Sequence, residues 1–334
     1  RSVVAKWMMI SNRKVAGKQL GGDHGPLRYY MSDTAEPEPD LSTWAPATAK
    51  ELKDELRAIA DGFGTGDEDP DSNAGDMHLS LLVHGYNTGF AGSLEFLRDV
   101  QNELFARRGL GRCVLFSWPS DGLVTNYLPD RADAVRSGAD LADVLADLYD
   151  ALEARQRLTI AKGVPCTAKT SVIAHSMGNF VLQKAAAAVW TRKNRPLLMS
   201  LINQLLMVGA DVDNDLFRAG ESVDGGDGDA RANLTYRITA LYTGHDQVLG
   251  ASAGLKHFGK RRLGRSGLDR NVESPDNVWD IDCSRFLESA DGLGPVSAHS
   301  AYFRSQEVLD LMAVLLRGAD RRLVERAFPR GGYE

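Results

Sequence analysis

From residue 79 onward, short apolar runs alternate with longer segments of helical periodicity, and this alternation constrains the fold more than any other feature. A nearly continuous apolar run such as Val172-Ile173-Ala174 is typical of a strand that is buried on both faces. Alternation of this kind predicts an α/β fold, with a mostly parallel sheet covered by helices on both faces. The predicted strands are Leu79–Val83, Cys113–Ser117, Thr170–Ala174, Leu205–Ala210, Arg237–Thr243 and Asn277–Ile281.

Amphipathic helices are predicted between these strands. Leucines and valines recur at spacings of three and four over Phe90–Arg108 and Ala134–Gln156. An earlier helix, Ala49–Ala60, follows Thr48, which is a good capping residue. Because no linker-like stretch interrupts the alternation, we expect one domain over residues 1–334. Residues 77–318 would form its core, and residues 1–76 an N-terminal extension packed on it.

Composition excludes several classes of protein. With 39 Lys+Arg against 45 Asp+Glu, the net charge of -6 argues against an electrostatic nucleic-acid binder. The longest apolar runs are far too short for a membrane-spanning helix. The 3 cysteines include no Cys-x-x-Cys pair, which argues against a disulfide framework and a structural zinc site. The acidic stretch 62–76 lacks the sixth-position glycine of a calcium loop, so we expect a solvated loop.

The N-terminus gives little information on the compartment. Residues 3–10 are largely apolar, but this run is too short for a signal peptide, and basic residues follow at Arg13 and Lys14. We therefore expect a cytoplasmic protein, and a signal removed from a longer chain stays an alternative.

The segment after the predicted strand Thr170–Ala174 has the pattern of a nucleophile elbow. Ser176 has small residues two positions before and after it, Ala174 and Gly178, and a helical pattern follows. Only small residues fit a turn this tight, which would lift the serine hydroxyl above the sheet and direct the helix N-terminus at a developing oxyanion. We predict that Ser176 is a nucleophile. The alternative is an incidental serine in a strand-to-helix turn.

A His-Gly step follows the predicted strand Leu79–Val83, in the sequence His84-Gly85-Tyr86-Asn87. Hydrolases with a nucleophile elbow place an oxyanion-binding backbone N–H in the loop after an early strand. We therefore assign the backbone N–H groups of Tyr86 and Met177 as the oxyanion donors. The alternative is that the glycine only turns the chain.

Two strand ends offer a carboxylate that could orient a histidine. Asp246 follows the predicted strand Arg237–Thr243, and Asp211 and Asp213 follow Leu205–Ala210. We favour Asp246 as the acid, with Asp211 as the competitor. An aspartate that caps the next helix is the simpler alternative for Asp246.

The base is predicted to be His299. It lies after the last predicted strand and before the amphipathic pattern Tyr302–Leu316, which keeps the Ser…Asp…His order of this chemistry. Of the other histidines, His24 and His78 precede the nucleophile and His84 lies in the oxyanion turn. His175 should point away from Ser176, and His245 neighbours the acid. His257 lies in a basic stretch, Lys256–Arg265, which we expect to be a solvated face.

Taken together these segments resemble the α/β-hydrolase superfamily, and within it the bacterial group known as alpha/beta hydrolase of unknown function. The resemblance implies an α/β-hydrolase fold, Ser176, Asp246 and His299 as the catalytic triad, and an esterase-like activity. One departure is Ala298, where the group is expected to have glycine. The matching segments are Asn12-Arg13, LVHGYN (82–87), LFSWPS (115–120), AHSMGN (174–179), INQLLMVGADVD (202–213), LYTGHD (241–246), VWDID (278–282) and AHSAYF (298–303).

The expected function is that of a serine carboxylesterase acting on small to medium acyl esters through an acyl-enzyme, with no metal or organic cofactor. An amidase, peptidase or acyltransferase of the same fold, and a non-catalytic binding protein, remain alternatives. The connection from residue 210 to 236 is about two dozen residues long, near the upper end of ordinary loops. It is rich in Gly and Asp, which predicts a flexible flap and no large cap domain. Leu123, Tyr127 and Leu128 are predicted either to line an acyl site or to pack as ordinary loop residues. The expected partner is a small-molecule ester, and the oligomeric state stays open.

Overall fold

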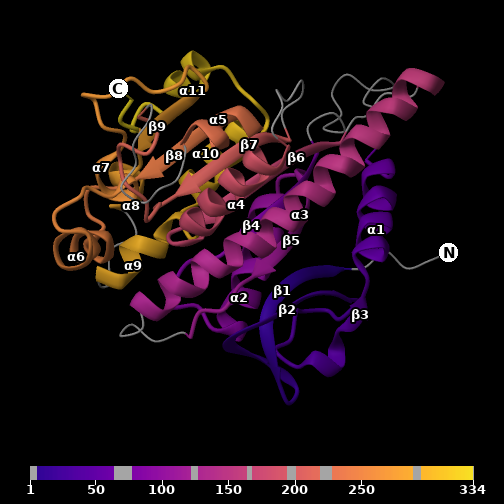
Figure 1. Ribbon diagram of the computed structural model, residues 1–334. Coiled ribbons are helices and arrows are strands. Elements are labelled where there is room, and N and C mark those ends of the chain that lie inside the picture. Colours follow the sequence, from indigo (N-terminus) through magenta and orange to yellow (C-terminus); the bar gives the residue numbers. More distant parts are fainter. Residues whose placement is uncertain are drawn as a thin grey trace. The chain divides into compact units, whose positions relative to one another are not determined.

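A computed structural model describes residues 6–63, 77–121, 127–163, 168–193, 201–218, 228–288 and 295–333. The chain forms two compact units, residues 1–171 and residues 172–334, and each is described by itself (Figure 1). The predicted division into a core and an N-terminal extension stays a prediction. The expected acidic loop at 62–76 lies almost wholly outside the described residues.

The sheet of the first unit has the strand order β3-β2-β1-β5-β4. β1 and β2 form an antiparallel hairpin that turns at Gly17, whose φ of 63° is readily adopted by glycine. β5 pairs in parallel with β1 on one side and with β4 on the other. The N-terminal segment therefore supplies strands to the sheet itself, and Met8 and Met9 on β1 are fully buried. The bounds are β1 Trp7–Ala16, β2 Gln19–Ser32, β3 Ala45–Ala47, β4 His78–Val83 and β5 Gly111–Ser117.

The helices of the first unit follow the predicted pattern with two differences. Thr48 caps α1 as expected, and Glu51 completes a capping box with it. The helix predicted over 90–108 is α-helical only in its first part and continues as a π-helix. α3 is longer than predicted at both ends. The bounds are η1 Leu41–Thr43, α1 Ala49–Asp61, α2 Phe90–Asp99, the π-helix η3 Val100–Ala106 and α3 Tyr127–Lys162.

The sheet of the second unit has the order β6-β7-β8-β9, and β7, β8 and β9 pair in parallel. β6 begins just before the boundary between the units. The bounds are β6 Lys169–His175, β7 Ile202–Val208, β8 Thr235–Tyr242 and β9 Val278–Asp282, with helices α4 Gly178–Lys193, α5 Gly228–Leu234, α6 Gln247–Lys256, α7 Leu263–Ser266, α8 Ser284–Leu287, α9 Pro295–Ser300, η5 Ala301–Phe303, α10 Gln306–Leu316 and α11 Arg321–Ala327.

Apolar side chains fill the interior of the second unit. Leu205 and Leu206, which are adjacent and so point to opposite faces of β7, are both 0% exposed, as a strand covered on both faces requires. α10 begins at Gln306 and not at Tyr302, because the Ser305 hydroxyl accepts a hydrogen bond from the Val308 N–H and so caps the helix there. The predicted mostly parallel α/β architecture is confirmed. No helix among the described residues is both long and apolar enough to cross a membrane.

Candidate active site

The turn after β6 holds Ser176 in a left-handed backbone conformation, with φ at 51°. This conformation is unfavourable for a residue other than glycine, and it persists only where the surroundings impose it. The Ser176 N–H donates to the Val208 carbonyl (3.0 Å), and the Ser176 carbonyl accepts from the Asp211 N–H (3.1 Å). The Asn179 amide donates to the Ala174 carbonyl at 2.7 Å. The turn is therefore held on both sides, as a nucleophile elbow requires.

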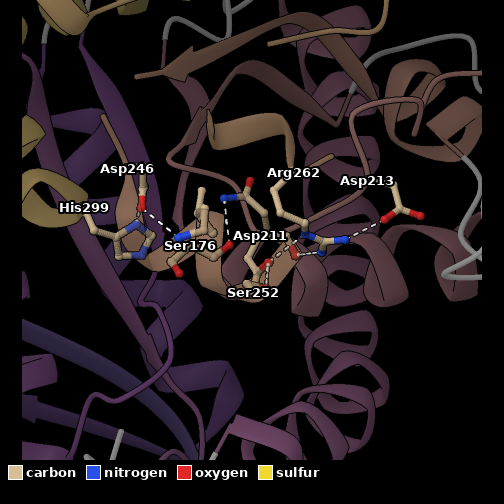
Figure 2. Close-up of polar contacts among 9 residues, drawn as sticks. Ser176, Asp211, Asp213, Asp246, Ser252, Arg262 and His299 are labelled. Atoms are coloured by element: carbon tan, nitrogen blue, oxygen red, sulfur yellow. Dashed lines mark hydrogen bonds and ion pairs between the residues drawn. The ribbon is translucent and has the colours of Figure 1, made fainter. Parts of the chain in front are cut away.

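Asp246 and His299 form a close pair in the same unit. His299 Nδ1 lies 2.6 Å from Asp246 Oδ2, and the two residues are 8% and 0% exposed (Figure 2). The second carboxylate oxygen, Oδ1, accepts a hydrogen bond from the Leu249 N–H at 2.9 Å and so caps α6. The two oxygens of Asp246 therefore have separate contacts, one with the first turn of α6 and the other with the imidazole. A carboxylate bound on two sides keeps a fixed orientation.

The other ring nitrogen of His299, Nε2, is buried and has no hydrogen-bond partner among the described residues. A carboxylate can only accept, so a hydrogen bond to it needs the N–H on Nδ1, and in the neutral tautomer Nε2 is then an acceptor. An unpaired buried acceptor costs about 1–3 kcal/mol, so Nε2 is a position at which a further polar group could bind. Gly209, at φ 51°, lies against the ring, and a Cβ there would be 3.7 Å from two of its atoms.

Asp211, the competing acid, is bound elsewhere. Arg262 donates to its carboxylate at 2.8 Å through Nε, and Ser252 donates to the same oxygen at 3.1 Å. Arg262 also binds Asp213 at 2.5 Å. Figure 2 shows this cluster on one side of Ser176 and the Asp246–His299 pair on the other. The geometry therefore favours Asp246 as the partner of the histidine.

The prediction of a solvated basic face over 256–265 is wrong for Arg262, which is 0% exposed. Its guanidinium lies between two buried carboxylates, so that it is withdrawn from water together with its counter-charges. The loop packs closely here, because a Cβ on Gly264 would lie 2.2 Å from the carbonyl carbon of Gly209. The sequence shows two acids and a cluster of basic residues, but not which basic residue turns inward.

His175 contacts His299, which was not expected from the sequence. Its Nε2 lies 2.9 Å from the His299 carbonyl oxygen, and the two ring centroids are 4.9 Å apart. Burial and the nearby imidazole of His299 lower the pKa of His175 to about 3. The ring is therefore neutral near pH 7 and donates from Nε2 to the backbone of the histidine. Adjacency to the nucleophile was the only sequence signal, and it does not show where the ring points.

In the first unit, the predicted oxyanion turn is anchored at its start by His84. The Trp118 backbone N–H donates to His84 Nε2 at 3.1 Å, and the Trp118 indole N–H donates to the His84 carbonyl at 2.8 Å. The two rings are stacked with centroids 5.2 Å apart. Asn87 has a left-handed backbone, with φ at 56°. The turn is thus as tightly held as the elbow, and the roles of the Tyr86 and Met177 amides stay predictions.

The predicted acyl-site residues behave differently from one another. Tyr127 is 3% exposed and meets the Tyr86 ring edge to face at 5.5 Å, whereas Leu128 is 68% exposed. Leu123 lies outside the described residues. Among the residues that are described, no group of three or more His, Cys, Asp and Glu side chains could hold a metal ion.

Several solved structures are similar to the chain. Lipase B from Aspergillus fumigatus is 15% identical, with a TM-score of 0.35, over 80% of this chain and 57% of that one. Phospholipase PlaB from Legionella pneumophila in complex with thio-NAD is 13% identical, with a TM-score of 0.33, over 76% of this chain and 61% of that one. Ferulic acid esterase from Streptomyces cinnamoneus is 14% identical, with a TM-score of 0.37, over 92% and 87%.

The chain spans less than two thirds of the lipase and of the phospholipase. No curated protein sequence matches it. The assignment rests instead on the family whose description is alpha/beta hydrolase of unknown function, which matches residues 71–309. This match covers most of the chain and includes the elbow, the Asp246–His299 pair and the His84 turn. The chain therefore belongs to this family of alpha/beta hydrolases, and it has the fold of that superfamily.

Proposed function

We propose that the protein is a serine hydrolase, and that it acts as a carboxylesterase on small to medium acyl esters. The observation that carries this proposal is the Asp246–His299 contact at 2.6 Å in the unit that also contains the elbow serine. A buried carboxylate on Nδ1 and an unpartnered Nε2 are what a histidine needs to act as a general base. A cap alone would need only one of the two oxygens of Asp246.

In the proposed mechanism, His299 Nε2 takes the proton of Ser176 Oγ as the oxygen attacks the acyl carbonyl. Asp246 keeps the imidazole in the required tautomer and stabilises the imidazolium that forms. The alcohol leaves with the proton from His299, and the acyl group stays on Ser176 as an ester. A water molecule, deprotonated by His299, then attacks this ester. The bond from the acyl carbon to Ser176 Oγ breaks, His299 returns the proton to Oγ, and the acid is released.

The negative charge that develops on the carbonyl oxygen needs donors. We assign this role to the backbone N–H groups of Met177 and Tyr86. Support for Met177 is its position directly before α4, where the helix dipole favours an anion. Support for Tyr86 is its place in the family-matched turn, whose ends are held by hydrogen bonds. A donor of this kind contributes roughly 3 kcal/mol.

The experiment is a panel of p-nitrophenyl esters of rising chain length, with wild-type protein and Ser176→Ala. We expect turnover of the shorter esters by the wild type and a loss of at least about 10³-fold in the variant. A fluorophosphonate probe should label the wild type and not the variant. Ser42→Ala, which removes a serine hydroxyl bound to Asp40 in the first unit, is the control and should be labelled normally.

Equal turnover by the wild type and Ser176→Ala would contradict the proposal, and so would a folded wild type that the probe does not label. Anilides with the same acyl groups separate an amidase from an esterase, because only the leaving group differs. Added alcohols separate an acyltransferase, since a new ester would then form in place of the free acid.

A further inference from the structure

Arg13, on β1, is buried in the first unit, and none of its hydrogen-bond partners among the described residues is a carboxylate. The side chain is 1% exposed, and its contacts are with hydroxyl, carbonyl and imidazole groups. Burial lowers the pKa of Arg13 to about 10, although Asp130 and Asp121 in the neighbourhood favour the charged form. The guanidinium is therefore still a cation near pH 7. A buried cation is costly unless its donors are satisfied, so its contacts are informative.

These contacts join two turns that are far apart in the sequence. Nη2 donates to the Thr88 carbonyl at 2.7 Å and lies 3.4 Å from His84 Nε2. Nε donates to the Ser117 hydroxyl at 2.9 Å, and Nη1 donates to the Ser120 carbonyl at 3.0 Å. The planar guanidinium fork of Arg13 therefore contacts both ends of the His84–Thr88 turn and both ends of the Ser117–Ser120 turn, which follows β5. Only a guanidinium presents donors in so many fixed directions.

The rest of the His84–Thr88 turn is held by groups around this fork. The Asn87 N–H donates to the Asp130 carboxylate at 3.3 Å, and the Thr88 N–H donates to the Ser120 hydroxyl at 3.2 Å. Asn87 itself has the left-handed backbone conformation, which these contacts must maintain. The direction of the Tyr86 N–H depends on the peptide planes on either side of it. Arg13 binds the carbonyl that closes the turn.

We propose that Arg13 is a positioning residue that fixes the His84–Thr88 turn, and with it the Tyr86 amide, for oxyanion binding. The expected effect on kcat rests on the proposed function, whereas the expected effect on the order of the turn rests only on the contacts of Arg13. Arg13 lies outside the family match, which begins at residue 71, while both turns that it joins lie inside. The N-terminal hairpin therefore supplies, from outside the matched region, a side chain that contacts both turns.

A role in stability alone makes a different prediction. Arg13→Met leaves the Ser117 hydroxyl and the Thr88 and Ser120 carbonyls without this donor, so the free energy of unfolding should fall whichever role is correct. A purely stabilising role would leave kcat and the exchange of the His84–Thr88 turn unchanged in the variant that is still folded. A positioning role instead requires that a folded Arg13→Met has a mobile turn and a slow chemical step. Arg13→Lys keeps the charge but loses the fork, so it separates charge from geometry.

The experiment measures amide hydrogen exchange and kinetics on the full chain for Arg13→Met and Arg13→Lys. Arg237→Met is the matched control, since it removes a part-buried arginine of the second unit that also binds a carbonyl, that of Ala319. In Arg13→Met we expect exchange in peptides covering 84–88 and 117–121 to rise at least about 10-fold, with no change beyond residue 172. With esters as substrates, kcat should fall about 10- to 100-fold, as for a weakened oxyanion donor, with KM within about threefold. Arg13→Lys should keep most of this loss, and Arg237→Met should show none of it.

Unchanged exchange in the 84–88 peptides of a folded Arg13→Met would overturn the proposal, and so would faster exchange with an unchanged kcat. If Arg13→Met does not fold, the same measurements are made on Arg13→Lys. The proposal is then overturned if the exchange rates and the kcat of Arg13→Lys equal those of the wild type. A third outcome separates the two proposals. If the turn exchanges faster in Arg13→Met but the wild type neither hydrolyses esters nor reacts with a fluorophosphonate, the positioning of the turn by Arg13 is supported and the proposed function is refuted.

Discussion

The neutral state of His175 should make the protein less stable in mild acid, and His175→Gln should remove this effect. Glutamine can donate to the His299 carbonyl, as the Nε2 of His175 does, but it does not titrate. In the folded protein the pKa of His175 is about 3, against an ordinary value of 6.5. Between these values the unfolded chain binds a proton at this position and the folded chain does not. Acidification therefore favours unfolding, and stability is lost as the pH falls from about 6.5 towards about 3.

The magnitude follows from the two pKa values. Each pH unit within this window changes the free energy of unfolding by about 1.4 kcal/mol. From pH 7 to pH 5 the contribution of His175 amounts to up to about 2 kcal/mol, because the first half unit lies above the pKa of the unfolded state. The wild type should therefore lose up to about 2 kcal/mol more than His175→Gln over this interval.

Urea unfolding followed by tryptophan fluorescence at pH 7, 6 and 5 measures the difference. His245→Gln is the control, because it removes an exposed histidine and should keep the wild-type pH dependence. If wild type and His175→Gln lose the same free energy between pH 7 and pH 5, His175 does not stay neutral in the folded protein, and the reasoning fails.

Three further outcomes are expected. Asp246→Asn keeps an oxygen to cap α6 but turns an N–H₂ towards His299, so kcat should fall about 10⁴-fold with little change in the free energy of unfolding. Asp211→Asn should lower kcat far less. If kcat instead falls more in Asp211→Asn than in Asp246→Asn, Asp211 is the acid. Gly264→Ala places a Cβ 2.2 Å from backbone, so the free energy of unfolding should fall by at least about 1–3 kcal/mol, and an unchanged urea midpoint would argue against that close packing. Thr48→Ala removes the capping box of α1 and should cost about 1 kcal/mol in the same assay, whereas a loss below about 0.3 kcal/mol would mean that the cap is not formed in solution.

The parts of the fold that depend on local sequence were predictable. The apolar run 170–174 becomes β6 (169–175), and the small residues around Ser176 accompany a left-handed turn, because both features are decided within a few residues. The same holds for the Thr48 cap. Asp246 was predictable as either a cap or an acid, and its two oxygens contact the first turn of α6 and His299 separately.

Contacts between distant segments were not predictable. Neither the burial of Arg13, which the sequence analysis noted only as part of a family segment, nor that of Arg262 could be predicted, because the acceptors of each come from segments that lie far away along the chain. His175 was expected only to point away from Ser176, and its ring meets His299, which lies more than a hundred residues later. Periodicity reports which face a side chain occupies and not what it meets there.

The pairing of β1 with β5 has a practical consequence for anyone who trims this protein to its family-matched region. Met9 and Ile10 of β1 lie opposite Leu115 and Phe116 of β5. A fragment that starts at residue 71 would leave these β5 residues on an unprotected edge, with free N–H and C=O groups beside two buried apolar side chains. Such an edge is a template for pairing with another chain, so the fragment should aggregate on expression. A useful truncation would keep β1, although the family match begins only at residue 71.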